Sequence, residues 1–169
     1  MRAISLDISD DRLHDLYEAF VREYFARHFN LTTRTRRIRW DVDAGTDYTF
    51  LPAMQADIVL EKGNSTLIID TKYYGSILSG RIGGKISSGH LYQILAYVKN
   101  YQANNCGAKV SGMLLYAKTM TDDFNGTTWD IGHHRIDVRT LNLDQKFSVI
   151  AGSLDMIVKD YFGNITRRS

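Results

Sequence analysis

The chain has 169 residues, of which 44% are hydrophobic and 24% charged, and its formal net charge is +2. These values are typical of one globular domain, and they neither require nor oppose a nucleic-acid partner. The single cysteine, Cys106, excludes an internal disulfide and a cysteine-based zinc site. No apolar run approaches the ~20 residues that a membrane-spanning helix needs, and the N-terminal region lacks the pattern of a signal peptide. We therefore expect a single domain over residues 1–169, located in the cytoplasm and not in a membrane.

The first part of the chain predicts a helix followed by an exposed strand. Apolar residues recur at spacings of three and four over residues 10–29, which indicates an amphipathic helix. The threonine- and arginine-rich segment 32–40 predicts the exposed strand, and Gly45 among several aspartates predicts a turn over residues 41–48. The apolar face of the helix contains Leu13, Leu16, Tyr17, Phe20, Val21, Tyr24 and Phe25.

A β-hairpin is predicted next. Residues 56–60 and 66–71 have strand composition, and the segment 61–65 between them holds the glycine, asparagine and serine of a hairpin loop. Residues 67–69 are all apolar, which is typical of a central strand covered on both faces.

The second half of the chain alternates helices and strands. Residues 75–89 are rich in glycine and serine and predict a mobile loop. A helix over 90–102, a strand over 109–116 and two short strands between 128 and 143 follow. A closing helix over 144–161 has one apolar face, made of Phe147, Ile150, Leu154, Ile157 and Tyr161. This order predicts an α/β (α+β) fold with a mixed central sheet flanked by helices.

The candidate chemistry lies in Asp57, Asp70 and Lys72. Asp57 is near the start of the first hairpin strand, and the other two are near the end of the second, so antiparallel pairing brings them together. Residues two apart on a strand face the same side, which places Asp70 and Lys72 in one site. Charged groups at the end of a buried strand are costly unless something compensates them.

A hard cation is one such compensation. Mg²⁺ takes oxygen ligands and keeps several waters, so Asp57, Asp70 and the backbone carbonyl of Thr71 are sufficient. The metal would polarise a phosphate and lower the pKa of a water, while Lys72 would orient that water or stabilise charge on the phosphate. The alternative is a surface hairpin in which aspartate and lysine form an ordinary ion pair.

Five segments in this order resemble the PD-(D/E)XK nuclease superfamily, and more closely the C-terminal nuclease domain of the McrC family, the cleavage subunit of McrBC modified-cytosine restriction systems. The resemblance extends from about residue 10 to 162, and it departs from the superfamily pattern at Ala56, where proline is expected. The segments are Leu16–Val21, Met54–Leu60, Ile68–Tyr74, His90–Tyr97 and Gly112–Tyr116.

The resemblance implies a restriction-endonuclease-like αβββαβ core over about 10–118, with extra strands and a helix over about 119–162. It also implies that Asp57 and Asp70 bind Mg²⁺, with Mn²⁺ as a substitute, and that Lys72 is catalytic. The expected activity is hydrolysis of phosphodiester bonds in double-stranded DNA, as an endonuclease of a restriction or defence system. Two rivals remain: a DNA- or partner-binding scaffold that does not cleave, and a nuclease for branched DNA or RNA.

The McrC family also implies a partner. Its members carry an N-terminal region that engages McrB, a GTP-hydrolysing AAA+ protein that reads the modified base. Because only residues 1–9 precede the first predicted helix, we expect this chain to be a fragment or a short relative that lacks the McrB-binding region. One centre cuts one strand, so a double-strand break needs a dimer or two converging complexes.

Three further residues match the family motifs. Gln93 is expected to hold the attacking water or a metal-bound water, and Tyr97, four residues later on the same helix face, to contact a phosphate or to brace the site. For both, packing at the rim of the core is the alternative. Glu18 is expected to add a carboxylate near the metal, the alternative being a solvated ion pair with Arg22.

Other residues are candidates for DNA contact. Arg81 and Lys85 in the glycine-rich loop could bind phosphates, and of Tyr73 and Tyr74 one is expected to pack inside and the other to line the DNA cleft. A basic cluster on the predicted strand could bind phosphates too, or be only a solvated face; it contains Arg34, Arg36, Arg37 and Arg39.

Two other sequence features do not predict a functional site. The segment 80–86 is not a phosphate-binding P-loop, because Ile86 stands where serine or threonine is required, so no nucleotide site is expected. The pair His133 and His134 lacks further ligands at metal spacing.

Overall fold

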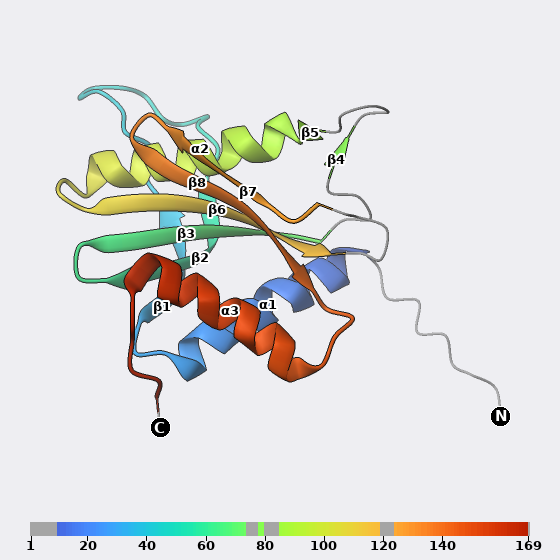
Figure 1. The fold of residues 1–169 in the computed structure, drawn as a ribbon. Coiled ribbons are helices and arrows are strands. Elements are labelled where there is room, and N and C mark those ends of the chain that lie inside the picture. Colours follow the sequence, from blue (N-terminus) through green and yellow to red (C-terminus); the bar gives the residue numbers. More distant parts are fainter. Residues whose placement is uncertain (1–9, 74–77, 80–84, 119–123, 169) are drawn as a thin grey trace.

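A computed structural model describes residues 10–73, 78–79, 85–118 and 124–168. In this part of the chain, three helices and eight strands follow one another (Figure 1). They are α1 Asp10–His28, β1 Thr32–Ile38, β2 Met54–Lys62, β3 Ser65–Lys72, β4 Leu78–Ser79, β5 Lys85–Ile86, α2 Ser88–Asn104, β6 Lys109–Lys118, β7 Thr127–Ile131, β8 His134–Asn142 and α3 Phe147–Phe162.

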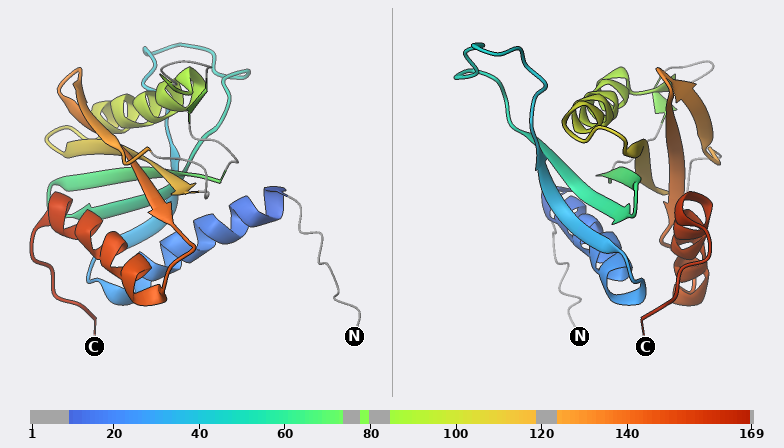
Figure 2. Two further views of the ribbon diagram at one scale, coloured as in Figure 1. Left: turned by 45° about the vertical axis from the view of Figure 1, so that its right-hand side comes forward. Right: turned by 90° about the vertical axis from the view of Figure 1, so that its left-hand side faces the viewer.

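Six strands form one mixed sheet in the order β1-β2-β3-β6-β8-β7. β3 pairs with β6 in parallel, and β6 with β8 in parallel, while the other pairs are antiparallel. Helices α1 and α3 cover one face and α2 covers the other (Figures 1 and 2). The predicted class, a mixed sheet flanked by helices, is confirmed.

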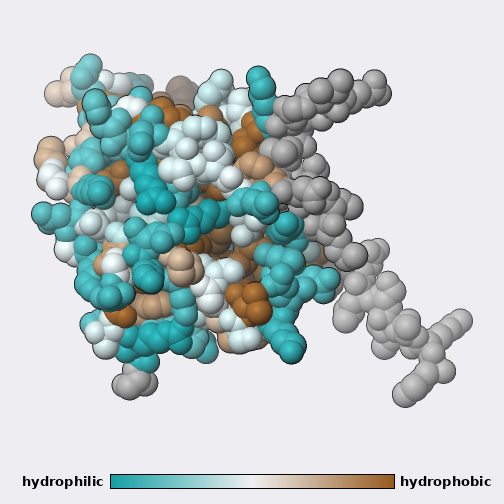
Figure 3. Space-filling model, viewed as in Figure 1, coloured by the Kyte–Doolittle hydropathy of each residue, from teal (hydrophilic) through white to brown (hydrophobic). Residues whose placement is uncertain are grey.

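Two apolar clusters occupy the two faces of the sheet. The cluster under α1 and α3 includes Val21, Phe25 and Leu154, and the cluster under α2 includes Ile94 and Val98. On the face of the molecule shown in Figure 3, hydrophilic residues predominate and the hydrophobic ones form small separate patches. None of the helices described is long and apolar enough to cross a membrane.

β3 is the central strand that residues 67–69 predicted. Every residue from Thr66 to Lys72 is buried, because helices cover both faces of the strand and β2 and β6 flank it. The register with β2 runs from Ile58 opposite Ile69 to Lys62 opposite Ser65. The predicted loop over 61–65 is therefore too long: only residues 63–64 connect the strands, and Gly63 has the positive φ (55°) that such a tight turn requires.

Other expectations need correction. The predicted loop over 75–89 contains β4 and β5, which pair with each other, and the start of α2 at Ser88; residues 74–77 and 80–84 lie outside the described part. β8 is a nine-residue strand and not a short one. Leu16 and Phe147, both expected on apolar faces, are 64% and 59% exposed: Leu16 lies at the edge of the buried stripe of α1, and Phe147 is the first residue of α3.

Gly112 on β6 allows α2 to lie close against the sheet. A Cβ atom at this position would lie 2.8 Å from Ile94 Cγ1 and from Val98 Cγ2, and 3.0 Å from Ile136 Cδ1. Ile94 and Val98 belong to α2, so the absence of a side chain at Gly112 sets the height of that helix above the sheet. The same helix carries Gln93.

Candidate functional site

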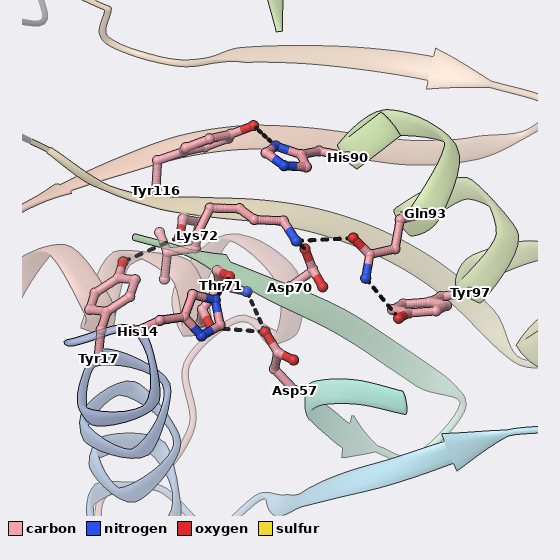
Figure 4. Close-up of polar contacts among 11 residues, drawn as sticks. His14, Tyr17, Asp57, Asp70, Thr71, Lys72, His90, Gln93, Tyr97 and Tyr116 are labelled. Carbon is pink, nitrogen blue, oxygen red and sulfur yellow. Dashed lines mark hydrogen bonds and ion pairs between the residues drawn. The ribbon is translucent and has the colours of Figure 1, made fainter. Parts of the chain in front are cut away.

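The hairpin and α2 bring four of the predicted residues together (Figure 4). Asp57 lies near the start of β2, and Asp70 and Lys72 near the end of β3. Ile68 packs in the cluster under α2, so the alternation along the strand turns Asp70 and Lys72 toward the same helix. Gln93 in the second turn of α2 faces them.

Thr71 fixes the position of the Asp57 side chain. The backbone N–H and the Oγ1 hydroxyl of Thr71 both donate to Asp57 Oδ2, each at 2.8 Å. The other carboxylate oxygen, Oδ1, accepts no hydrogen bond within the described part of the chain. One oxygen of Asp57 thus anchors the side chain to β3, and the second is available to a ligand.

A chain of polar contacts runs from Asp70 to Tyr97. The Lys72 ammonium pairs with the Asp70 carboxylate and donates to Gln93 Oε1 at 3.0 Å. Gln93 Nε2 in turn donates to the Tyr97 hydroxyl at 2.9 Å. Because Tyr97 takes the amide nitrogen, Gln93 presents its oxygen to Lys72, which holds the ammonium beside Asp70.

Burial makes the charge of Asp70 unfavourable. Asp70 is 1% exposed, and burial, together with the nearby negative charge of Asp57, raises its pKa to about 6, although Lys72 and His14 act in the opposite direction. Burial and the charge of Asp57 also raise the pKa of Glu18. The three carboxyl groups therefore share a region that an added cation would stabilise.

This pKa shift predicts a pH-dependent stability in metal-free solution. Between pH 4 and 6 the folded protein keeps a proton on Asp70 that the unfolded chain has lost, so stability falls as the pH rises. The shift from 3.8 to about 6 corresponds to a loss of about 3 kcal/mol above pH 6. In denaturant titrations with EDTA, Asp70→Asn should match the wild type at pH 4 and exceed its free energy of unfolding at pH 7.5. Parallel pH profiles for the two proteins would contradict this prediction.

The donor set fits a hard cation that keeps several waters. Asp57 offers one unused oxygen, and the buried Asp70 Oδ2 meets Lys72 only as an ion pair, with no hydrogen bond to the described residues. No three histidine, cysteine, aspartate or glutamate side chains of the described part are arranged to bind a metal together. The two carboxylates and the Thr71 carbonyl are oxygen donors of the kind that Mg²⁺ accepts, and Mg²⁺ keeps several waters when it binds.

His14 on α1 is a site residue that sequence reasoning missed. Its Nε2 lies 3.0 Å from the carbonyl oxygen of Thr71, the backbone group predicted as a metal ligand. A cation that used this carbonyl would share it with His14. The available signal was spacing, since His14 is four residues before Glu18 and thus on the same helix face.

His90 was also missed. Its Nδ1 lies 2.7 Å from the Tyr116 hydroxyl, and Tyr116 is the cross-strand partner of Lys72 on β6. Burial, followed by the charge of Lys72, lowers the pKa of His90. The residue is three positions before Gln93, a spacing that places both on one side of α2.

The remaining predicted residues divide into three groups. Glu18 pairs with Arg22 at 2.5 Å, as the alternative interpretation had it, while burial, followed by the negative charge of Asp57, raises its pKa. Tyr97 is only 6% exposed, which favours bracing over phosphate contact. Tyr73 is partly buried and packs against the cluster under α1 and α3, with its ring 6.1 Å from that of Tyr17. The last group is untested: Lys85 is exposed on β5, and Tyr74 and Arg81 lie outside the described residues.

In its fold and its grouped carboxylates, the chain is an α+β domain of the restriction-endonuclease-like type. Residues 12–117 match the family described as McrBC 5-methylcytosine restriction system component. The chain belongs to this family.

One curated relative and one solved structure are similar to the chain. The chain is 32% identical over 150 residues to the type IV methyl-directed restriction enzyme EcoKMcrBC of Escherichia coli (strain K12), a match that covers 86% of this chain and 42% of the relative. It also superposes with a TM-score of 0.54, at 17% identity, on a chain of the refined half-complex from the tetradecameric assembly of Thermococcus gammatolerans McrB AAA+ hexamers with bound McrC. That match covers 86% of this chain and 33% of the other, and it shows a shared fold. The chain thus spans less than half the length of either relative.

Proposed function

We propose that this chain is a Mg²⁺-dependent endodeoxyribonuclease domain, the cleavage component of a McrBC-like restriction system. The observation that carries the proposal is the meeting of Asp57, Asp70 and Lys72 at the end of β3, with Gln93 bonded to the lysine. The membership of a restriction-system family supports it.

The side chains would divide the work of hydrolysis. Asp57 Oδ1, the Asp70 carboxylate and the Thr71 carbonyl would hold Mg²⁺, and the ion would polarise the scissile phosphate and lower the pKa of a water. Lys72 would stabilise negative charge on the phosphate or orient the water. Gln93, held by Tyr97, would keep the lysine ammonium at its place and present its amide oxygen to a water.

The burial of Asp70 argues against a scaffold that does not cleave. A charged carboxylate buried near a second carboxylate lowers stability at neutral pH, and a scaffold gains nothing from it. In a nuclease the bound cation would offset the charge of the same carboxylate. The stability that the metal-free protein loses by burying Asp70 would then serve metal binding.

A partner protein is part of the proposal. One matching structure contains McrB AAA+ hexamers with bound McrC, and this chain covers only a third of the matching chain there. We propose an AAA+ partner of the McrB type, which would engage a region outside residues 1–169 and gate the nuclease.

The test is cleavage of supercoiled plasmid DNA by the purified chain. We expect nicked and linear products with Mg²⁺ or Mn²⁺, none with EDTA, and a rate that increases with the cognate AAA+ partner and GTP. Absence of cleavage by the folded protein with either metal, methylated plasmid, partner and GTP would contradict the proposal. A melting temperature that does not respond to Mg²⁺ or Mn²⁺ would instead favour the scaffold.

A further inference from the structure

Two cavities adjoin each other where the chain leaves β1. The first, about 410 Å³, lies between the end of β1 and the C-terminal part of α2 and has a largely polar lining that includes Tyr101 and Asn104. The second, about 430 Å³, lies under the segment that connects β1 to β2 and has a largely apolar lining. Arg37 and Arg39 line both cavities, so they stand on the boundary between them.

The structure divides the four arginines of the basic cluster over residues 34–39 into two pairs. Arg34 and Arg36 both pair with Glu61, and Arg36 also donates to the Tyr101 hydroxyl at 2.9 Å. The single carboxylate of Glu61 thus offsets one of their two positive charges and holds both side chains in place. The side chains of Arg37 and Arg39 have no hydrogen bond or ion pair to any part of the chain that the structure describes. These two guanidinium groups are exposed and available to an anion.

The apolar cavity is held in shape by hydrogen bonds to its wall. Trp40 Nε1 donates to the Pro52 carbonyl at 2.7 Å, which fixes the indole ring within the connecting segment. The Asp41 backbone N–H donates to Asn100 Oδ1, and Asn104 Nδ2 to the Arg39 carbonyl, so α2 anchors the start of the segment. The segment extends from the sheet beside α2 (Figure 2). An aromatic ring and two arginines are therefore presented on a built surface.

This surface lies near the candidate active site. Arg37 is the cross-strand partner of Gln55, and Gln55 is two residues before Asp57 on β2. Two residues of a strand span about 7 Å, and Met54 at the start of β2 lines the apolar cavity. A polymer that places a phosphate at Asp57 and Asp70 would reach the two arginines within a few of its own units.

We propose that the surface formed by Arg37, Arg39, Trp40 and Tyr48 binds the DNA strand beside the scissile phosphate. The inference rests on the proposed function. Arg37 and Arg39 bind backbone phosphates, since a guanidinium matches a phosphate with two parallel hydrogen bonds. Trp40 and Tyr48 offer apolar faces to the adjoining sugar and base, as aromatic residues do in nucleic-acid grooves. Unpaired arginines beside an aromatic wall favour a polyanion over a second protein, whose apolar contacts would leave two charges without partners.

The test measures binding and cleavage separately. Binding of a fluorescein-labelled duplex is followed by anisotropy in an Asp70→Asn background, which keeps the duplex intact. We expect Arg37→Ala/Arg39→Ala to weaken binding about tenfold and to reduce the slope of log Kd against log salt concentration by about two, one for each lost phosphate contact. The control Arg27→Ala/Arg168→Ala removes the same charge at the far end of α1 and should change neither quantity much.

Trp40 provides a second readout. The chain has two tryptophans, so Trp129→Phe leaves Trp40 as the only one. Its fluorescence should change on addition of DNA and should not change in the Arg37→Ala/Arg39→Ala variant at the same DNA concentration.

The possible outcomes distinguish failure of the proposed DNA-binding surface from failure of the proposed nuclease function. If the wild type cleaves DNA while the double variant binds like its control and Trp40 does not respond, the surface is not a DNA subsite and the proposed function stands. If the double variant alters the oligomeric state in sedimentation but not DNA affinity, the surface is a protein interface and the inference is wrong. If DNA is neither bound nor cleaved, both proposals fall.

Discussion

Replacement of Lys72 by methionine is expected to reduce DNA cleavage at least about 100-fold, the usual cost of removing a group that stabilises charge in the transition state. Lys72 is 6% exposed, pairs with Asp70 and donates to Gln93. Methionine keeps most of the volume of the side chain, so the fold should survive. Without the ammonium, the pKa of Asp70 should rise further, because Lys72 is the largest of the influences that lower it.

Lys62→Met is the matched control. Lys62 is at the end of β2, exposed, in the same hairpin as Lys72. This variant should cleave plasmid DNA at the wild-type rate. Single-turnover cleavage with the same Mg²⁺ concentration compares the two, and melting curves check that both are folded. A Lys72→Met variant that is folded and cleaves like Lys62→Met would show that the site has been assigned wrongly.

Substitution of Gly112 is expected to displace α2 from the sheet and, with it, the Gln93 side chain of the candidate site. An added methyl group at this position would contact Ile94 and Val98 at 2.8 Å, so α2 must move or its side chains must leave their preferred rotamers. Gly112→Ala should lower the free energy of unfolding by about 1–3 kcal/mol, the usual range for overpacking a core. It should also reduce cleavage, because Gln93 moves with α2 away from Lys72.

Gly152→Ala separates this effect from that of alanine itself. Gly152 is exposed in the middle of α3, and a Cβ atom there would meet nothing within 4 Å. Alanine favours the helix over glycine by about 1 kcal/mol, so this variant should be slightly more stable and fully active. Urea titrations of both variants give the comparison. If Gly112→Ala unfolds at the wild-type urea concentration and cleaves normally, α2 does not depend on close approach at this point.

The sequence predicted the parts of the fold that local patterns determine. The continuous apolar run over residues 67–69 identified the central strand, and the two-residue spacing of Asp70 and Lys72 correctly placed them on one side of it. The spacing of Gln93 and Tyr97 placed both on one face of α2, where the structure joins them by a hydrogen bond. The hydrogen bond between Lys72 and Gln93, by contrast, depends on how α2 lies across the sheet, which no local pattern determines.

Several features were beyond sequence reasoning because they depend on tertiary geometry. The contact between His14 and the Thr71 carbonyl requires the rotation of α1 about its axis, which the apolar pattern fixes only coarsely, as the exposure of Leu16 shows. The basic cluster over residues 34–39 looked uniform, yet Glu61 on the neighbouring strand pairs only with Arg34 and Arg36. Alternation along β1 and the turn that follows it leave Arg37 and Arg39 without a hydrogen bond or ion pair among the residues that the structure describes.

The tight β2–β3 turn has a consequence for the order in which the site is assembled. Asp57 and Thr71 are joined by hydrogen bonds across adjacent strands of one hairpin, so the carboxylate pair forms as soon as that hairpin does. Gln93 arrives only when α2 docks over Gly112. Because parts of a protein open independently, hydrogen exchange in α2 can be faster than in β3. A protein molecule with α2 detached would keep its cation ligands but lose the hydrogen bond that holds its lysine, and would therefore bind metal before it is competent to cut.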